Sequence, residues 1–163
     1  MERLNDQERL GLTFDHIIHA SGSGGTQGGL VVGKEFTGWI GKISGISVAM
    51  KREVLENKVY GLSSETADIL GGRVDRRSVV VDDNYIGEGY AIRTERAEKA
   101  IEIFSRREGI FLDHVYTGKV AGALLDRLEK FRSESAVYSH RRQRGVICRE
   151  LIKIRQYGLS GSH

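Results

Sequence analysis

The chain has 163 residues, of which 39% are hydrophobic and 29% are charged, a composition typical of a soluble globular domain. Its net charge of +3 does not indicate a nucleic-acid partner, because residues 1–132 hold 19 basic and 20 acidic side chains and the excess lies in residues 133–163. No apolar run approaches the ~20 residues of a membrane span, and the start lacks the apolar core of a signal peptide. With one cysteine and therefore no internal disulfide, we expect a cytoplasmic protein that binds neither nucleic acid nor membrane.

Strands and helices are predicted to alternate along the chain. Residues 14–20 and 43–49 are apolar enough to be buried strands, and Val79–Val81 forms a third, shorter one. The predicted helices cover residues 26–36, 51–70, 94–108 and 117–131, and residues 110–115 are predicted to be extended. This alternation predicts an α/β domain with a mostly parallel sheet, in which ligands bind at the carboxyl ends of the strands.

The glycine-rich turn at residues 21–26, Ser-Gly-Ser-Gly-Gly-Thr, lies at such a strand end. Glycines let backbone N–H groups converge, the hydroxyls of Ser23 and Thr26 add donors, and the N-terminus of the next helix adds partial positive charge. The turn therefore indicates a site for a phosphate group.

Several phosphate sites share this general arrangement. A nucleotide P-loop is excluded because no Lys-Ser/Thr pair follows the last glycine. A dinucleotide fingerprint is incomplete, since Gln27 stands where the third glycine belongs and Glu53 is a weak candidate for the acidic ribose ligand. A tight connection without any ligand is the remaining alternative.

Two sequence blocks resemble one enzyme family. The segment DHIIHASGSGGTQGGLVVG is similar to the cofactor-phosphate loop of the pyridoxal-phosphate (PLP) enzymes of the 1-aminocyclopropane-1-carboxylate (ACC) deaminase and D-cysteine desulfhydrase family. A later block, with GIFLDHVYTGK at its centre, resembles that family's GILLDPVYTGK stretch in the same order and spacing. The resemblance covers about residues 10–130 and implies the three-layer α/β/α, tryptophan-synthase-β-like fold.

The resemblance also implies roles for individual residues. Tyr116 would lie beside the cofactor ring and Thr117 would face the pyridine nitrogen. The residues expected to hold the phosphate are Ser23, Gly24, Gly25 and Thr26. In the ACC deaminases the place of Tyr116-Thr117 resembles Tyr-Glu, and a hydroxyl there favours a neutral ring nitrogen. This difference favours D-cysteine desulfhydrase-like α,β-elimination, which yields pyruvate, sulfide and ammonia.

The lysine that binds PLP covalently is not among the lysines of this chain. In the family it precedes the phosphate loop by a long stretch, which also contains the substrate-binding small domain, and Lys119 of VYTGK is a different lysine. Residues 1–132 are therefore expected to be the C-terminal portion of the PLP-binding large domain, lacking the N-terminal half and inactive alone. The family implies a small amino-acid substrate and a homodimer, with a partner chain as one source of the missing half. The alternatives are a non-catalytic remnant of a decayed gene and another lyase of this fold, similar to serine/threonine dehydratases.

The tail at residues 133–163 is predicted to be out of frame. The family ends in a motif close to NVLFIHTGG, whereas this chain reads ESAVYSHRRQRG. Codons compatible with Ser135–Gln143 give Val-Leu-Phe-Ile-His-Thr-Gly-Gly-Asn when read one base later. We therefore expect a frameshift near residues 130–134, which the codons of the gene test directly.

No metal site is expected. His16 and His19 have opposite parity on their strand and would face different sides of the sheet. Asp82, Asp83 and Glu88 lie in a loop, where solvated carboxylates are the simpler interpretation.

Overall fold

The computed structural model describes residues 16–127 together with residues 136 and 137. Its helices are α2 (Gly25–Thr37), α3 (Arg52–Ile69), α4 (Glu95–Glu108) and α5 (Thr117–Leu125), with a 3₁₀ turn at Arg76–Ser78. Its strands are β1 (His16–Ser21), β2 (Lys42–Ser47), β3 (Val81–Asp82) and β4 (Ala136–Val137).

The four strands form one parallel sheet in the order β3-β2-β1-β4. Strands β1 and β2 pair along their whole length, from His16 beside Lys42 to Ser21 beside Ser47. Because these two strands end level with one another, the segments that follow them leave the sheet at the same edge. Parallel pairing confirms the predicted α/β class.

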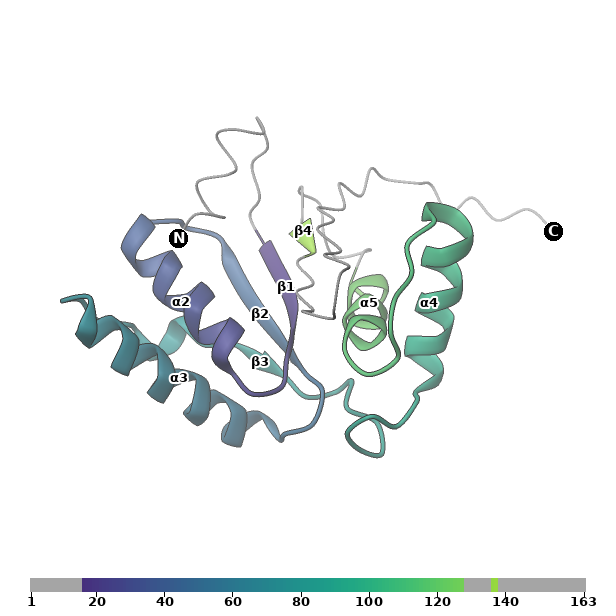
Figure 1. Cartoon of the computed structure of the whole chain (residues 1–163), viewed down its shortest axis with the longest axis horizontal. Coiled ribbons are helices and arrows are strands. Elements are labelled where there is room, and N and C mark those ends of the chain that lie inside the picture. Colours follow the sequence, from purple (N-terminus) through teal and green to yellow (C-terminus); the bar gives the residue numbers. More distant parts are fainter. Residues whose placement is uncertain (1–15, 128–135, 138–163) are drawn as a thin grey trace.

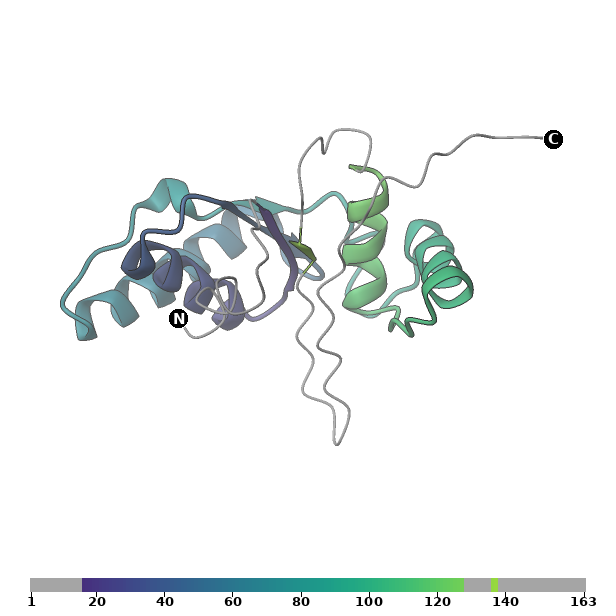
Figure 2. The same ribbon diagram turned by 90° about the horizontal axis from the view of Figure 1, so that it is seen from above.

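Helices cover both faces of the sheet, which gives the predicted three layers (Figure 1). Helices α2 and α3 pack on one face around Ile17 of β1 and Ile43 of β2. Helix α5 packs on the other face, around Ile18 and Ile46, and α4 lies outside α5 (Figure 2). Adjacent residues such as Ile17 and Ile18 serve opposite faces because side chains alternate along a strand.

Local signals in the sequence explain where the helices begin and end. The Thr94 hydroxyl caps α4 by accepting a hydrogen bond from the N–H of Ala97 at 3.2 Å. Gly38 and Gly109 end α2 and α4 in the left-handed conformation, with φ of 68° and 66°. These residues agree with the helix boundaries expected from the sequence.

Three expected elements differ from the structure. The helix expected over residues 117–131 begins at Thr117 but already ends at Leu125, with Asp126 at its C-cap. Residues 110–113 form no strand, and a turn at residues 114–116 leads directly into α5. The strand expected at Val79–Val81 is shorter and lies later in the chain: the 3₁₀ turn runs to Ser78 with Val79 as its C-cap, and β3 covers Val81–Asp82. The expected boundary at residue 132 lies outside the described residues. Of the tail that is expected to be out of frame, only β4 is described. Both the boundary and the frameshift stay predictions.

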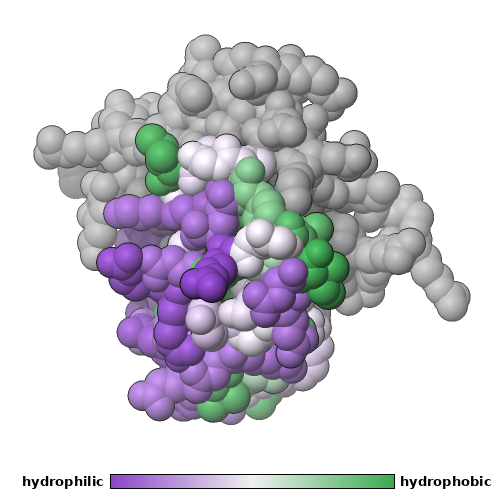
Figure 3. Space-filling view, turned by 90° about the vertical axis from the view of Figure 1, so that its left-hand side faces the viewer, coloured by the Kyte–Doolittle hydropathy of each residue, from purple (hydrophilic) through white to green (hydrophobic). Residues whose placement is uncertain are grey.

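Among the described residues seen in Figure 3, hydrophilic side chains predominate, with apolar side chains in smaller groups between them. None of the helices within the described residues combines the length and the hydropathy needed to cross a membrane.

Candidate cofactor site

The glycine-rich turn connects the carboxyl end of β1 to the first residue of α2. Gly24 has a φ of +88°, a conformation that other residues rarely adopt, and its carbonyl accepts the first helical hydrogen bond from the N–H of Gly28 at 2.8 Å. The N–H groups of the first turn, from Gly25 onward, have no acceptor inside a helix. They therefore point toward the space in front of the helix N-terminus.

The charges and hydroxyls around this helix end suit an anion. Ser23, Gly25 and Thr26 are exposed, and the first turn of α2 contains no acidic residue. Gly24 stands at the N-cap and no side-chain cap is formed there among the described residues, so the positive end of the helix suits a ligand. The expected phosphate-binding residues are thus brought together with their donors accessible.

Tyr116, from the second sequence block, lies against the turn. A β-carbon placed on Gly22 would lie 3.6 Å from Cε1 of Tyr116 and 3.4 Å from Cγ2 of Val48. These are ordinary van der Waals distances, which place the Tyr116 ring next to the backbone of the turn. The glycine-rich turn of the first sequence block and Tyr116 of the second therefore lie side by side, as expected if both bind one cofactor.

Tyr90 was not expected from the sequence, yet it belongs to this site. Its hydroxyl lies 2.5 Å from the hydroxyl of Tyr116, and the two rings meet edge to face with centroids 6.0 Å apart. Tyr90 follows an irregular loop whose side chains show no periodicity. Only its place in the second sequence block, which also contains Tyr116, could have indicated that it belongs to the site.

Asp113 fixes the segment that carries Tyr116 and Thr117. Its carboxylate accepts hydrogen bonds from the N–H groups of Val115 (2.9 Å), Tyr116 (2.8 Å) and Thr117 (3.2 Å) and from the Thr117 hydroxyl (2.7 Å). Partial burial raises the pKa of the Asp113 carboxyl, but the hydrogen bonds from Tyr116, Thr117 and Val115 outweigh it and hold the pKa below its ordinary value. The aspartate is therefore ionised at neutral pH and holds the start of α5.

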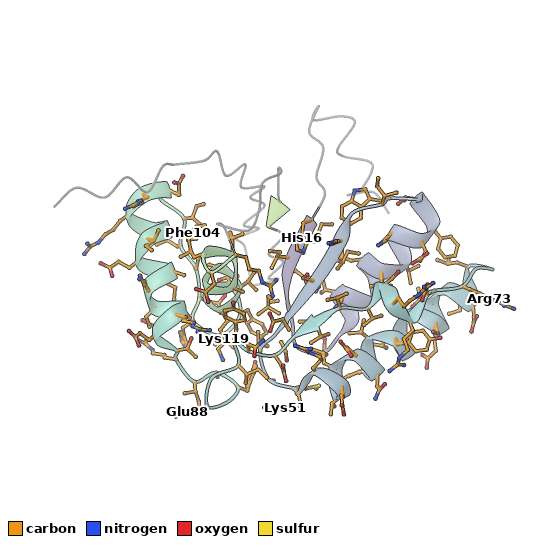
Figure 4. The ribbon with its side chains drawn as sticks, turned by 180° about the vertical axis from the view of Figure 1, so that it is seen from behind. His16, Lys51, Arg73, Glu88, Phe104 and Lys119 are labelled. Atoms are coloured by element: carbon orange, nitrogen blue, oxygen red, sulfur yellow. The ribbon has the colours of Figure 1, made fainter. Side chains whose placement is uncertain are left out.

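Lys119 is a structural lysine in this fold. Its ammonium donates to the carbonyl oxygens of Ile86 (2.7 Å) and Gly89 (3.1 Å), and burial lowers its pKa. Figure 4 shows Lys119 on α5 beside the loop that carries Glu88. The lysine thus fastens to α5 the loop that leads to Tyr90.

Polar side chains lie buried behind the turn. His19, Ser21 and Gln27 are each at least 98% inaccessible to solvent, and His19 Nε2, Ser21 Oγ and Gln27 Oε1 make no hydrogen bond within the described part of the chain. The amide nitrogen of Gln27 donates to the carbonyl of Val80 at 2.8 Å. Burial lowers the pKa of His19 to about 4, although the carbonyl of Ala20, which accepts its Nδ1–H, opposes this shift. The histidine is therefore neutral at physiological pH.

The charged residues of the neighbouring loop pair with one another. Arg127 at the end of α5 pairs with Asp82, and the N–H of Arg52 donates to Asp83 at 3.1 Å. His16 bonds through Nε2 to the hydroxyl of Ser44 at 2.8 Å, whereas His19 bonds through Nδ1 to the carbonyl of Ala20. Across residues 16–127, no group of three or more His, Cys, Asp or Glu side chains is arranged to hold a metal ion.

Comparison with known protein families shows the family of the chain. Residues 2–140 match the family described as "Pyridoxal-phosphate dependent enzyme". The chain belongs to this family. The residues present fit its cofactor, since the accessible donors at the start of α2 match a phosphate group and Tyr116 provides an adjacent aromatic face.

Two curated relatives of known activity are similar to this member of the family. One is the 1-aminocyclopropane-1-carboxylate deaminase of Burkholderia ambifaria, 35% identical over 85% of this chain and 43% of the relative. The other is the D-cysteine desulfhydrase of Yersinia enterocolitica, 37% identical over 77% of this chain and 39% of the relative. The chain thus spans about two fifths of the length of these relatives.

A solved structure of an ACC deaminase homologue agrees with this fold. It superimposes with a TM-score of 0.71 and 36% identity, and the match covers 78% of this chain and 39% of that one. The described strands and helices therefore correspond to part of the family's complete fold.

Proposed function

We propose that this chain forms the C-terminal portion of a PLP-binding domain in a D-cysteine desulfhydrase-like lyase. The observation that carries the proposal is the contact between the turn at Gly22 and the ring of Tyr116, which brings a phosphate-binding helix end and an aromatic face to one place. Bound PLP would supply an electron sink for reactions at the α-carbon of an amino acid.

The residues of the turn would hold the phosphate. The hydroxyls of Ser23 and Thr26 and the N–H groups of Gly25 and Thr26 would donate hydrogen bonds to its oxygens, with the helix N-terminus adding favourable charge. Gly24 would keep the backbone in the conformation that presents these donors.

Tyr116 and Thr117 would bind the ring. Tyr116 would lie beside it, oriented by its hydrogen bond with Tyr90, and Thr117 would face the pyridine nitrogen. Thr117 is also the feature that favours D-cysteine over ACC as substrate, because ACC deaminases resemble Tyr-Glu at this place.

The covalent lysine must come from elsewhere in the functional protein. Among the described residues, the buried lysine, Lys119, is held by two carbonyl oxygens. We propose that a preceding segment or a partner chain supplies the lysine and the substrate-binding region, in a cytoplasmic assembly that is a homodimer in the intact family. Without that part we expect cofactor binding but no turnover.

A titration with PLP tests the proposal. Binding is followed by the quenching of intrinsic fluorescence, with inorganic phosphate as competitor, and we expect saturable binding that phosphate displaces. The double variant Ser23→Ala/Thr26→Val should bind at least tenfold more weakly, because each lost hydrogen bond to a charged group costs about 1.5–3 kcal/mol. Ser105→Ala on α4, whose hydroxyl bonds within its own helix, is the matched control. No saturable binding would contradict the proposal.

Assays of pyruvate and sulfide release from D-cysteine, and of ammonia release from ACC, distinguish the candidate activities. We expect neither product from this chain alone. Turnover of D-cysteine after addition of a lysine-bearing N-terminal section would support the lyase, whereas binding without any such rescue favours a non-catalytic remnant.

A further inference from the structure

The Thr117 hydroxyl is held on two sides by a single residue, Asp113. The hydroxyl oxygen lies 2.7 Å from the carboxylate Oδ2 of Asp113 and also 2.7 Å from the backbone nitrogen of Asp113. A hydroxyl has one hydrogen to donate and two lone pairs with which to accept. These two contacts therefore determine what the hydroxyl can offer to a ligand.

The hydroxyl hydrogen is already committed. An ionised carboxylate can only accept, so the 2.7 Å contact with Oδ2 requires the hydroxyl to donate. The other acceptor within reach, at 3.4 Å, is the backbone carbonyl of the same Asp113. The N–H of Asp113 occupies one lone pair, which leaves the other lone pair as the free capacity of the hydroxyl.

We propose that Asp113 makes the Thr117 hydroxyl an acceptor toward the cofactor, so that the ring nitrogen facing it is bound in its protonated form. This inference rests on the proposed function, in which Thr117 faces that nitrogen. It differs from the simple expectation for a threonine, whose hydroxyl would donate to a neutral nitrogen if its hydrogen were free. Asp113 is then a positioning residue, which acts on the cofactor only through the Thr117 hydroxyl.

The substitution Asp113→Asn reverses the hydrogen bond. The side-chain oxygen of the asparagine is expected at the place of Oδ1, because two backbone N–H groups, those of Val115 and Tyr116, donate there. The amide NH₂ then takes the place of Oδ2 and donates to the Thr117 hydroxyl, at the expense of the longer 3.2 Å bond from the Thr117 N–H. The hydroxyl hydrogen becomes free to donate to the ring nitrogen.

The experiment is ¹⁵N NMR of PLP labelled at the ring nitrogen and bound to the full chain. Free labelled PLP above and below its ring pKa calibrates the resonances of the neutral and protonated nitrogen. We expect the protonated position with the natural chain and the neutral position with Asp113→Asn, while the affinity for inorganic phosphate stays within twofold. Thr117→Ser should keep the protonated position and Thr117→Val should lose it, which tests the inference even if Asp113→Asn does not fold.

The outcomes separate the two proposals. A neutral nitrogen in the natural chain with PLP bound, or a protonated nitrogen in a folded Asp113→Asn chain, overturns this inference and leaves the proposed function intact. Absence of saturable PLP binding overturns the proposed function and this inference with it.

Discussion

The hydroxyl of Tyr90 lies 2.5 Å from that of Tyr116, although a helix and two loops separate them along the chain. Hydrogen bonds from two further residues hold the segments that carry these tyrosines. Lys119 fastens the loop before Tyr90 to α5, and Asp113 holds the turn that carries Tyr116. The aromatic face beside the phosphate turn is therefore oriented from both of its flanking segments.

Removing the Tyr90 hydroxyl should weaken cofactor binding. Tyr90→Phe keeps the ring but deletes the hydrogen bond that orients Tyr116, and we expect an affinity loss of about 1 kcal/mol, or about fivefold, in the PLP titration. Tyr60→Phe is the control, because Tyr60 lies on α3 and its ring contacts Arg76. Equal affinities for the two variants would show that the Tyr90 hydroxyl does not orient Tyr116.

Gly24→Ala should destabilise the turn. The φ of +88° strains any residue with a β-carbon, and that carbon would lie 3.2 Å from Cγ2 of Val59. We expect a loss of about 1–2 kcal/mol in the free energy of unfolding, measured by urea denaturation. Gly29→Ala in α2 is the matched control, since nothing lies within 4 Å of its added carbon and alanine favours the helix by about 1 kcal/mol. A stabilised Gly24→Ala chain would contradict this account of the turn.

Lys119→Met should lower stability although it replaces a charge with an apolar group of similar length. The change leaves the carbonyls of Ile86 and Gly89 without their donor, and burying unpaired carbonyls costs about 1–3 kcal/mol each. Lys99→Met on α4, an exposed position, should be nearly neutral. Denaturation curves of the two variants give the comparison, and similar midpoints would mean that Lys119 does not hold the loop.

Stability should fall in mild acid because of His19. Its pKa is about 4 in the folded chain against an ordinary value of 6.5, so the unfolded chain binds the proton more readily between these values. The stabilisation is complete above pH 6.5, decreases as the pH falls, and is lost by about pH 4, for a total of about 3 kcal/mol. Urea denaturation between pH 7 and pH 4.5 measures the slope, which His19→Leu should flatten. An unchanged slope in a folded His19→Leu chain would assign the acid sensitivity to other groups.

The sequence predicted the backbone of the site better than its supporting contacts. The glycine turn, the Thr94 cap and the parallel strands follow from local residue preferences and side-chain periodicity, which a single sequence displays. Tyr90 and Lys119 could not be assigned in this way, because their roles depend on contacts between segments that are distant in sequence. Asp113 is an intermediate case, since an aspartate just before a helix suggests a cap, but its effect on the Thr117 hydroxyl requires coordinates.

The conformation of Gly24 has an evolutionary consequence. The turn obtains its geometry from β1, α2 and the neighbouring Val59 on α3, all of which are parts of the fold itself and not groups that react with a cofactor. Natural selection can therefore act separately on retention of the anion site and on turnover. A lineage that loses catalysis would be expected to keep the turn for as long as the fold itself is maintained, because substitutions at Gly24 are opposed by the stability of the domain.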